Sequence, residues 1–133
     1  MTPFSLKIVT PDGMEFEGQA EEVIVRTVSG DIGILAGHTD CVAPLGMGRA
    51  TVVIDGQKRY AACIGGMLSV VNGQATLVPT TFEWAEDIDV SRAERSFDRA
   101  QKILHDKDAS SADIKLAEAR LRRALIRKNV ASN

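Results

Sequence analysis

The stretch EWAEDIDVSRAE, residues 83–94, marks the point at which the spacing of apolar residues changes along the chain. Before it, short apolar and β-branched runs alternate with turn signals, which is the pattern of β-strands. After it, apolar residues recur at alternating steps of three and four, which is the period of one helical face. The sequence therefore predicts an α+β fold, with a β domain at residues 1–84 and a helical domain at residues 85–133.

The β half carries strong signals for tight turns. An Asp-Gly pair at residues 55–56 and an Asn-Gly pair at residues 72–73 each separate two apolar runs, and Pro-Asp-Gly follows the first run at residues 11–13. Such pairs favour two-residue hairpins. Strands this short and regularly spaced predict an antiparallel β-sandwich, or flattened barrel. Trp84 is expected to pack in a core where the two halves meet.

Two apolar stripes in the second half predict two helices. The first stripe contains Val90, Ala93, Phe97, Ala100 and Leu104, and the second contains Ile114, Ala117, Leu121 and Leu125. The polar stretch HDKDASS, residues 105–111, lies between them, so we expect an antiparallel two-helix hairpin. Alanines on both stripes, including Ala124, allow a close approach of the two helices.

Capping signals mark the starts of both helices. Asp89 or Ser91 can cap the first helix, and Ser91 with Glu94 forms a candidate capping box. Ser110 with Asp113 forms the second candidate box. A hairpin of this size buries little apolar surface and is expected to be marginal alone. It must therefore rest on the β domain or on another protein.

Charge is divided unevenly between the two halves. Residues 1–84 hold five Lys/Arg and nine Asp/Glu, whereas residues 85–133 hold eleven and nine. The segment RLRRALIRK, residues 120–128, is strongly basic and no acid follows Glu118. Cations suit a helix C-terminus, where the helix dipole is negative. Contact with an anion or an acidic protein explains the same pattern, and residue types alone leave both explanations open.

Composition narrows the class of protein. The chain has 133 residues, 44% of them hydrophobic and 26% charged, as in soluble globular domains. Its net charge of −2 gives no support for nucleic-acid binding or for attachment to an anionic membrane. Cys41 and Cys63 are expected to be free thiols in a reducing compartment. No run is long enough to span a bilayer, and residues 1–13 lack the pattern of a signal or transit peptide.

Catalytic motifs are missing from the sequence. It contains no P-loop, no GxGxxG and no GxSxG, and no second ligand pair accompanies the His38–Cys41 spacing that could begin a metal site. We therefore expect no metal and no catalysis. His38 is expected to make a backbone hydrogen bond or to contact a partner.

Four stretches occur together in one order: VTPDG at residues 9–13, SGDIGILAGHTD at 29–40, Gly-Gly at 65–66, and EWAEDIDVSRAE at 83–94. In combination they resemble the epsilon-subunit family of bacterial F-type ATP synthases, over essentially the whole chain. Ala36 departs from the family pattern, which has proline after Gly-Ile-Leu. That departure softens the turn without moving the glycines.

The resemblance implies a flattened β-sandwich followed by two α-helices, placed in the central stalk beside the gamma subunit and resting on the c ring. It implies coupling of proton- or sodium-driven ring rotation to ATP synthesis. It also implies inhibition of ATP hydrolysis when the helices extend toward the catalytic alpha and beta subunits. The expected location is peripheral, on the cytoplasmic face of the bacterial inner membrane, without membrane insertion and without a nucleic-acid partner.

The resemblance also assigns a role to residues 30–38. They resemble the family's loop at the contact between stalk and ring, with Asp31 and His38 as candidate contacts to the c ring or gamma. The apolar residues of the loop need not all be exposed, since some of them can fill the sandwich. A plain internal turn is the alternative.

A further resemblance concerns nucleotide. Some bacterial members bind ATP on the folded hairpin through an Ile/Leu-Asp-x-x-Arg-Ala pattern with arginines further on. The matching residues here are Glu83, Ile88, Asp89, Arg92, Ala93, Arg99, Arg123 and Arg127. This implies ATP as a regulatory ligand. The alternatives are salt bridges within the hairpin, and a role for Asp89 solely as a helix cap.

Two other functions remain open. The chain could be a free-standing nucleotide-sensing module, with the β domain as its scaffold, or a small enzyme with His38 as its base. A free-standing nucleotide-sensing module differs from a stalk subunit because it does not depend on gamma or on the catalytic head.

Overall fold

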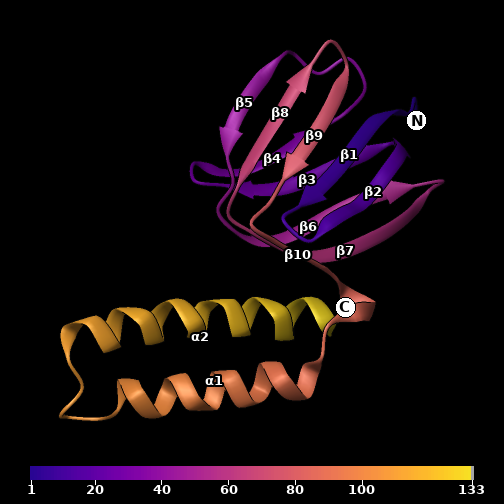
Figure 1. The fold of residues 1–133 in the computed structure, drawn as a ribbon. Coiled ribbons are helices and arrows are strands. Elements are labelled where there is room, and N and C mark those ends of the chain that lie inside the picture. Colours follow the sequence, from indigo (N-terminus) through magenta and orange to yellow (C-terminus); the bar gives the residue numbers. More distant parts are fainter. Residues whose placement is uncertain (133) are drawn as a thin grey trace. The chain divides into compact units, whose positions relative to one another are not determined.

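The computed structural model describes residues 1–132 and divides into two compact units, Met1–Trp84 and the part from Ala85 onward (Figure 1). The first unit contains all the described strands, and the second contains a short 3-10 helix and two α-helices. The predicted α+β fold, a β-sandwich followed by a helical hairpin, is confirmed.

The sandwich is built from two five-stranded sheets (Figure 1). One has the order β2-β1-β9-β8-β5, and the other has the order β10-β7-β6-β3-β4. The strands are β1 (Phe4–Thr10), β2 (Gly13–Ala20), β3 (Glu22–Thr27), β4 (Gly30–Ile34), β5 (Cys41–Pro44), β6 (Met47–Ile54), β7 (Gln57–Ile64), β8 (Met67–Val71), β9 (Gln74–Val78) and β10 (Thr81–Trp84). All strand pairs are antiparallel except β1 with β9, which run parallel.

The two predicted hairpin turns are present. Asp55 and Gly56 join β6 to β7 with φ values of 51° and 76°. Asn72 and Gly73 join β8 to β9 with φ values of 50° and 80°. Positive φ at both central residues is the signature of the type I′ turn, whose twist matches that of paired strands.

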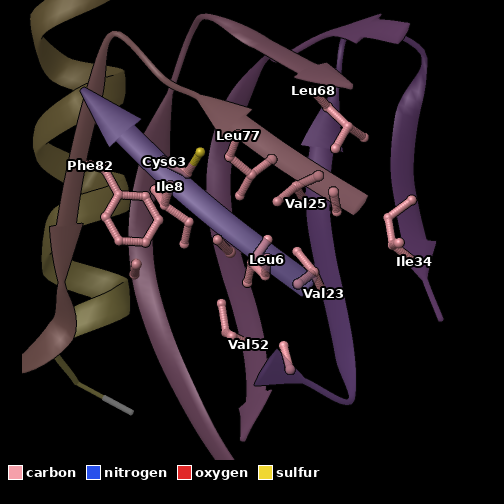
Figure 2. Close-up of a cluster of buried hydrophobic side chains, with 14 of the residues drawn as sticks. Leu6, Ile8, Val23, Val25, Ile34, Val52, Cys63, Leu68, Leu77 and Phe82 are labelled. Atoms are coloured by element: carbon pink, nitrogen blue, oxygen red, sulfur yellow. The ribbon is translucent and has the colours of Figure 1, made fainter. Parts of the chain in front are cut away.

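The core of the sandwich lies between the two sheets. Figure 2 shows side chains of both sheets in one cluster, including Leu6, Ile8, Val23, Val25, Val52, Leu68 and Leu77. Trp84 belongs to this cluster and is 5% exposed. Its ring packs edge-on against Phe82, with centroids 4.9 Å apart, and the guanidinium of Arg59 lies 3.7 Å from its centroid. The prediction of a core role for Trp84 is therefore confirmed.

The helical unit begins with the 3-10 helix η1 (Ala85–Asp87), followed by α1 (Val90–Leu104) and α2 (Ser111–Ala131). Asp89 caps α1, because its Oδ1 accepts a hydrogen bond from the backbone N of Arg92 at 3.0 Å. Ser91 lies inside the helix, so the predicted Ser91–Glu94 capping box is wrong. Ser110 caps α2 as predicted, with its Oγ accepting from the backbone N of Asp113 at 3.1 Å.

The helices pack through small residues. Ala93 and Ala100 of α1 and Ala117 and Ala124 of α2 are all buried, as predicted. Val90 and Leu125 were expected on the buried stripes, but each is 43% exposed. Val90 is the first residue of its helix. In α2, Ala124 rather than its neighbour Leu125 continues the stripe, which follows the tighter period of 3.5 expected for closely packed helices.

Gly66 allows the chain to cross from one sheet to the other between β7 and β8. Its φ is +96°, and a Cβ atom there would lie 2.0 Å from the carbonyl oxygen of Val78. We predict that Gly66→Ala lowers the free energy of unfolding of the sandwich by at least about 3 kcal/mol, because backbone atoms must move. Urea unfolding followed by Trp84 fluorescence measures the loss.

Gly73→Ala is the matched control, since Gly73 also has a positive φ but no atom within 4 Å of the added Cβ. It should cost only the conformational strain, about 1–2 kcal/mol. Equal losses for the two variants would show that the close approach at Gly66 is relaxed without cost.

Candidate functional site

The segment from Gly30 to His38 is mostly a strand rather than a loop. Residues Gly30–Ile34 form β4, which pairs with β3 and lies at the edge of its sheet (Figure 1). A tight turn precedes it, in which the hydroxyl of Thr27 donates to the carbonyl of Gly30 at 2.7 Å and Gly30 adopts a φ of +117°. The expected contact loop therefore consists of an edge strand and a short turn around Gly37.

The apolar side chains of this segment divide between core and surface. Ile34 is 1% exposed and belongs to the core, and Ile32 packs against the same cluster while remaining partly exposed. Leu35 is 46% exposed. The expectation that some of these residues fill the sandwich is confirmed, and Leu35 is the one left at the surface.

Asp31 forms an ion pair across the β3–β4 ladder. It lies opposite Arg26 in the register, and its Oδ1 accepts from the Nε of Arg26 at 2.6 Å. Both side chains are about half exposed, so the pair adds only about 0–1 kcal/mol to stability. Arg26 was not predicted from the sequence. Only the strand register, which depends on the turn at Gly30, shows that it faces Asp31.

Arg26 rests against two glycines of the neighbouring segment. A Cβ atom at Gly48 would lie 2.8 Å from the Cβ of Arg26, and the backbone N of Gly46 donates to the carbonyl of Arg26 at 2.9 Å. Larger residues at Gly48 would displace Arg26. The glycines thus fix the position of the Arg26–Asp31 pair on the surface.

His38 makes two local hydrogen bonds to backbone carbonyls, which was one of the two roles expected for it. Its backbone N donates to the carbonyl of Leu35 at 3.1 Å, and its Nδ1 donates to the carbonyl of Thr39 at 2.7 Å. Next to it, Asp40 accepts a hydrogen bond from the backbone N of Asn72 at 2.9 Å, which ties the segment to the β8–β9 turn. The segment is therefore held in place by its own backbone and by a second turn.

The predicted nucleotide residues belong to both units. Glu83 lies in β10 opposite Ala62, within the sandwich unit. The hairpin unit holds the remainder: Ile88, Asp89, Arg92, Ala93, Arg99, Arg123 and Arg127. Ile88 is buried, at 8% exposed, just before the capping residue Asp89. Asp89 acts as a helix cap through one of its two carboxylate oxygens. A capping role was one of the alternatives to nucleotide binding.

Three of the proposed nucleotide-binding arginines have no ion pair in the described part of the chain. Within the described residues, Arg92, Arg99 and Arg123 make no side-chain ion pair. The helix positions three and four residues from Arg123 are occupied by alanine, isoleucine and two arginines. Arg127 is half-buried, and its Nε is shielded from solvent. Salt bridges within the hairpin, the alternative explanation, are thus not observed for Arg92, Arg99 or Arg123 in the described residues.

A small pocket lies on the hairpin and contains an arginine that the sequence analysis missed. Its volume is about 160 Å³, and it is lined by Ser96, Arg99, Ala100, Ile103 and Arg120. The sequence does offer one signal for Arg120, which is its spacing of seven residues before Arg127 on α2. The register between the two helices, which places Arg120 beside Arg99, could not be obtained from spacing alone.

Other kinds of site find little support in the described residues. No group of three or more His, Cys, Asp or Glu side chains could hold a metal ion in residues 1–132. Burial raises the pKa of the Cys63 thiol to about 12, so it is not a nucleophile at neutral pH. Across the same residues, no helix is both long enough and apolar enough to cross a membrane.

Comparison with known proteins covers the chain in two parts. Residues 3–85 match the β-sandwich domain of the ATP synthase delta/epsilon chain, and residues 86–132 match the long α-helix domain of the same chain. The chain belongs to the ATP synthase delta/epsilon family. Members of this family are structural and regulatory subunits rather than catalytic ones, as the resemblance implied.

Relatives of similar length support this membership. The ATP synthase epsilon chain of Bacillus velezensis is 43% identical over 133 residues and covers all of both chains. That of Ruminococcus albus is 40% identical, with 99% of this chain and 98% of the relative covered. A chain in the Euglena gracilis mitochondrial ATP synthase structure shares the fold, with a TM-score of 0.83 at 21% identity over 99% of this chain and 82% of that chain.

The two cysteines are expected to differ in reactivity. Thiolate is the reactive form, and at pH 8 a thiol with a pKa of about 12 is ionised in only roughly one molecule in ten thousand. We predict that iodoacetamide at pH 8 modifies the partly exposed Cys41 while the buried Cys63 stays unmodified, as measured by mass spectrometry. In urea both should react. Rapid labelling of Cys63 in the folded chain would mean that the sandwich core opens readily.

Proposed function

We propose that this chain is the epsilon subunit of the central stalk of a bacterial F-type ATP synthase, peripheral to the cytoplasmic face of the inner membrane. Its sandwich links the gamma subunit to the c ring, so that proton or sodium flow drives rotation and ATP synthesis. Its hairpin restrains ATP hydrolysis by the alpha and beta subunits. The observation that carries this proposal is full-length similarity to bacterial epsilon chains, in both the sandwich and the helices.

An exposed apolar face on the sandwich supports a lasting contact with another subunit. On the sheet that ends in β5, Pro44, Met67 and Val78 lie in one row across three neighbouring strands and are all exposed. Val42 and Val71, at 66% and 51% exposed, extend this face. Such patches mark protein–protein contacts. We assign this face to gamma, and a free-standing nucleotide sensor has no use for it.

The edge strand β4 supplies a second, polar contact. Asp31 and Arg26 present one exposed ion pair on it, and Leu35 and His38 follow in the adjoining turn. A half-exposed ion pair fixed by glycines offers a donor and an acceptor in a set geometry. We assign this surface to the polar loops of the c ring.

The Asp31 surface can be tested in a reconstituted synthase. We predict that Asp31→Leu reduces ATP-driven ion pumping relative to ATP hydrolysis, because the bulky side chain removes the ion pair and crowds the contact, at a cost of about 1–3 kcal/mol. Pumping is followed with a pH-sensitive dye and hydrolysis with a coupled assay.

The matched control is Glu17→Leu, which removes an exposed cross-strand ion pair with Lys7 on the edge strand β2 of the other sheet. It should leave the ratio of pumping to hydrolysis unchanged. Unchanged coupling in Asp31→Leu would indicate that residues 30–38 form a plain internal turn.

The hairpin is proposed to bind ATP as a regulatory ligand. Arg92, Arg99 and Arg123 carry guanidinium forks without acidic partners in the described residues, and such forks suit phosphate oxygens. Gathering like charges on one small unit is costly unless an anion joins them. Ile88, Asp89 and Arg127 of the same unit complete the proposed site, with Asp89 also capping α1. Glu83, which lies in the sandwich unit, stays a prediction from the resemblance. Binding without hydrolysis is expected.

The packing of the hairpin explains how ATP could control it. The buried residues of α1 and α2 are four alanines and Val130. Alanine methyl groups bury little apolar area, so these fully buried positions contribute little hydrophobic stabilisation. ATP that binds only the folded hairpin shifts the balance by its difference in affinity for the two forms. When ATP falls, the hairpin opens and the basic end of α2 reaches acidic loops of the catalytic subunits.

Isothermal titration of the full chain with ATP tests the nucleotide site. We predict saturable binding that weakens at least tenfold in both Arg92→Ala and Arg123→Ala, since each loses a charge-assisted hydrogen bond of about 1.5–3 kcal/mol. Arg122→Ala is the control, because Arg122 is exposed and lies next to Arg123 on another face of α2.

Loss in both variants would place the two helices at one site. If millimolar ATP gives no binding heat with the unaltered chain, the nucleotide proposal is wrong. The stalk assignment would survive, and the arginines would then serve contacts with the catalytic head.

A further inference from the structure

Two hairpin turns of the sandwich have the same backbone geometry but differ in one hydrogen bond. Asp55 and Gly56 form the turn between β6 and β7, and Asn72 and Gly73 form the turn between β8 and β9 (Figure 1). All four residues are exposed and have positive φ values. At the first turn, the backbone N of Gly56 donates to Oε1 of Glu21 at 2.6 Å. In the described part of the chain, the backbone N of Gly73 makes no hydrogen bond.

The bond to Glu21 holds the peptide group at the tip of its turn. A flip of the one peptide between the two central residues converts a type I′ turn into a type II′ turn, with ψ of the first residue changing from about +30° to about −120° and φ of the second changing sign. Glycine adopts both signs of φ readily, and it occupies the second position of both turns. The flip at Gly56 must break the hydrogen bond to Glu21, whereas Gly73 has no such bond to lose.

The flipped form of the second turn aligns two groups that can react. The backbone N of Gly73 reaches the side-chain amide carbon of Asn72 only when that nitrogen and the Cβ of Asn72 are eclipsed about the Cα–C bond. In an L-residue this requires a ψ of about −120°, which is the value in a type II′ turn. The φ of Asn72 is already 50°. One peptide flip therefore brings the nitrogen to the carbon without moving the strands on either side.

Little shields these two groups in the folded sandwich. Among residues 1–132, the side chain of Asn72 makes no hydrogen bond, and only its backbone N is bound, to Oδ1 of Asp40 at 2.9 Å. A Cβ atom at Gly73 would meet no atom within 4 Å. The other asparagine that the structure describes, Asn129, lies inside α2, where the next backbone N is used by the helix and is crowded by the branched side chain of Val130.

We propose that Asn72–Gly73 is a site of spontaneous modification, at which Asn72 becomes aspartate or isoaspartate through a cyclic succinimide. A base such as hydroxide removes the proton from the backbone N of Gly73, and this nitrogen attacks Cγ of Asn72. The new C–N bond closes a five-membered ring, while the bond from Cγ to the side-chain nitrogen breaks. That nitrogen takes a proton from water and leaves as ammonia.

Water then opens the succinimide at one of its two carbonyl carbons. Attack at the side-chain carbonyl restores the normal backbone and leaves aspartate. Attack at the main-chain carbonyl leaves isoaspartate, in which the backbone runs through the former side chain. The sum of the steps consumes one water and releases one ammonia, with no oxidation or reduction.

Both products disturb the turn between β8 and β9. Each places a new carboxylate beside Asp40, which accepts the hydrogen bond from the backbone N of residue 72, and like charges this close repel. Isoaspartate also adds one carbon to the backbone, so the two-residue type I′ turn is lost. The strands that this turn joins carry Leu68 and Leu77 of the core. Modification should therefore lower the stability of the sandwich.

The test compares the two turns within one chain. Each modification rate is measured in the folded full chain and again in guanidinium chloride at the same neutral pH, so that the intrinsic difference between asparagine and aspartate cancels. Mass spectrometry of the digested chain locates the products, and an isoaspartyl methyltransferase is the probe for isoaspartate. At Asn72 the folded rate should lie within about tenfold of the unfolded rate. Folding should slow the reaction at Asp55 by at least a further factor of about ten, since the flip there breaks a hydrogen bond to a charged group.

Glu21→Ala tests whether the carboxylate of Glu21 causes this difference. In the folded chain it should accelerate isoaspartate formation at Asp55 by about tenfold and leave the rate at Asn72 within about twofold of its original value. Glu17→Ala is the matched control, because it removes an acid of β2 that pairs with Lys7 and touches neither turn. It should change neither rate.

Asn72→Gln links the modification to stability. Glutamine would have to close a six-membered ring, which forms far more slowly. After prolonged incubation the unaltered chain should unfold at a lower urea concentration than fresh chain, whereas the Asn72→Gln chain should show no such shift.

Three results would overturn the proposal. They are equal protection of the two turns by folding, conversion of Asn72 to aspartate without any isoaspartate, and an unchanged unfolding midpoint once Asn72 is modified. Should Glu21→Ala fail to fold, the comparison of the two turns in the unaltered chain still decides. The measurements need no other subunit and no nucleotide, so their outcome is independent of the proposed function.

Discussion

The fully buried positions of the two helices are four alanines and one valine, and the behaviour of the hairpin depends on this constraint. Ala93 and Ala100 face α2, and Ala117 and Ala124 face α1. Small residues let the helix axes come close, which carries the arginines on both helices toward one another. The same residues contribute little hydrophobic stabilisation. Close approach and little hydrophobic stabilisation therefore follow from one choice of residue, and both support our proposal that a bound anion stabilises the folded hairpin.

The sandwich is built on the opposite principle. Large aliphatic side chains from both sheets fill its core, and Gly66 permits a backbone approach that no other residue tolerates. A unit packed in this way changes shape little when it meets a partner. Its apolar face and the fixed Arg26–Asp31 pair suit permanent contacts, whereas the hairpin suits a conditional one. One chain thereby joins a closely packed sandwich to a hairpin for which we propose two states.

Features that depend on local backbone and side-chain chemistry were predicted from the sequence. Features that depend on packing between elements were not. The Asp-Gly and Asn-Gly turns, the Ser110 cap and the alanine stripes follow from backbone preference and helical period. Leu125 was misplaced because a 3.6 period allows either of two adjacent positions, and only contact with the other helix selects Ala124. Arg26 and Arg120 were missed because each needs a register, one between strands and one between helices. The edge strand β4 was expected to be part of a loop because residues 30–38 resemble the family's contact loop.

The energies are compatible with the proposed control of the hairpin by ATP concentration. A ligand present at one hundred times its dissociation constant stabilises the form that binds it by about 2.7 kcal/mol. That is comparable with burying one or two aliphatic side chains, about 1.5–3 kcal/mol each, and so with much of what an alanine contact provides. Repulsion between the arginines works in the opposite direction and is screened by salt, which acts over about 8 Å at physiological ionic strength. With ATP bound as proposed, the folded hairpin would depend most on this ligand at low salt, where the guanidinium groups repel one another most strongly.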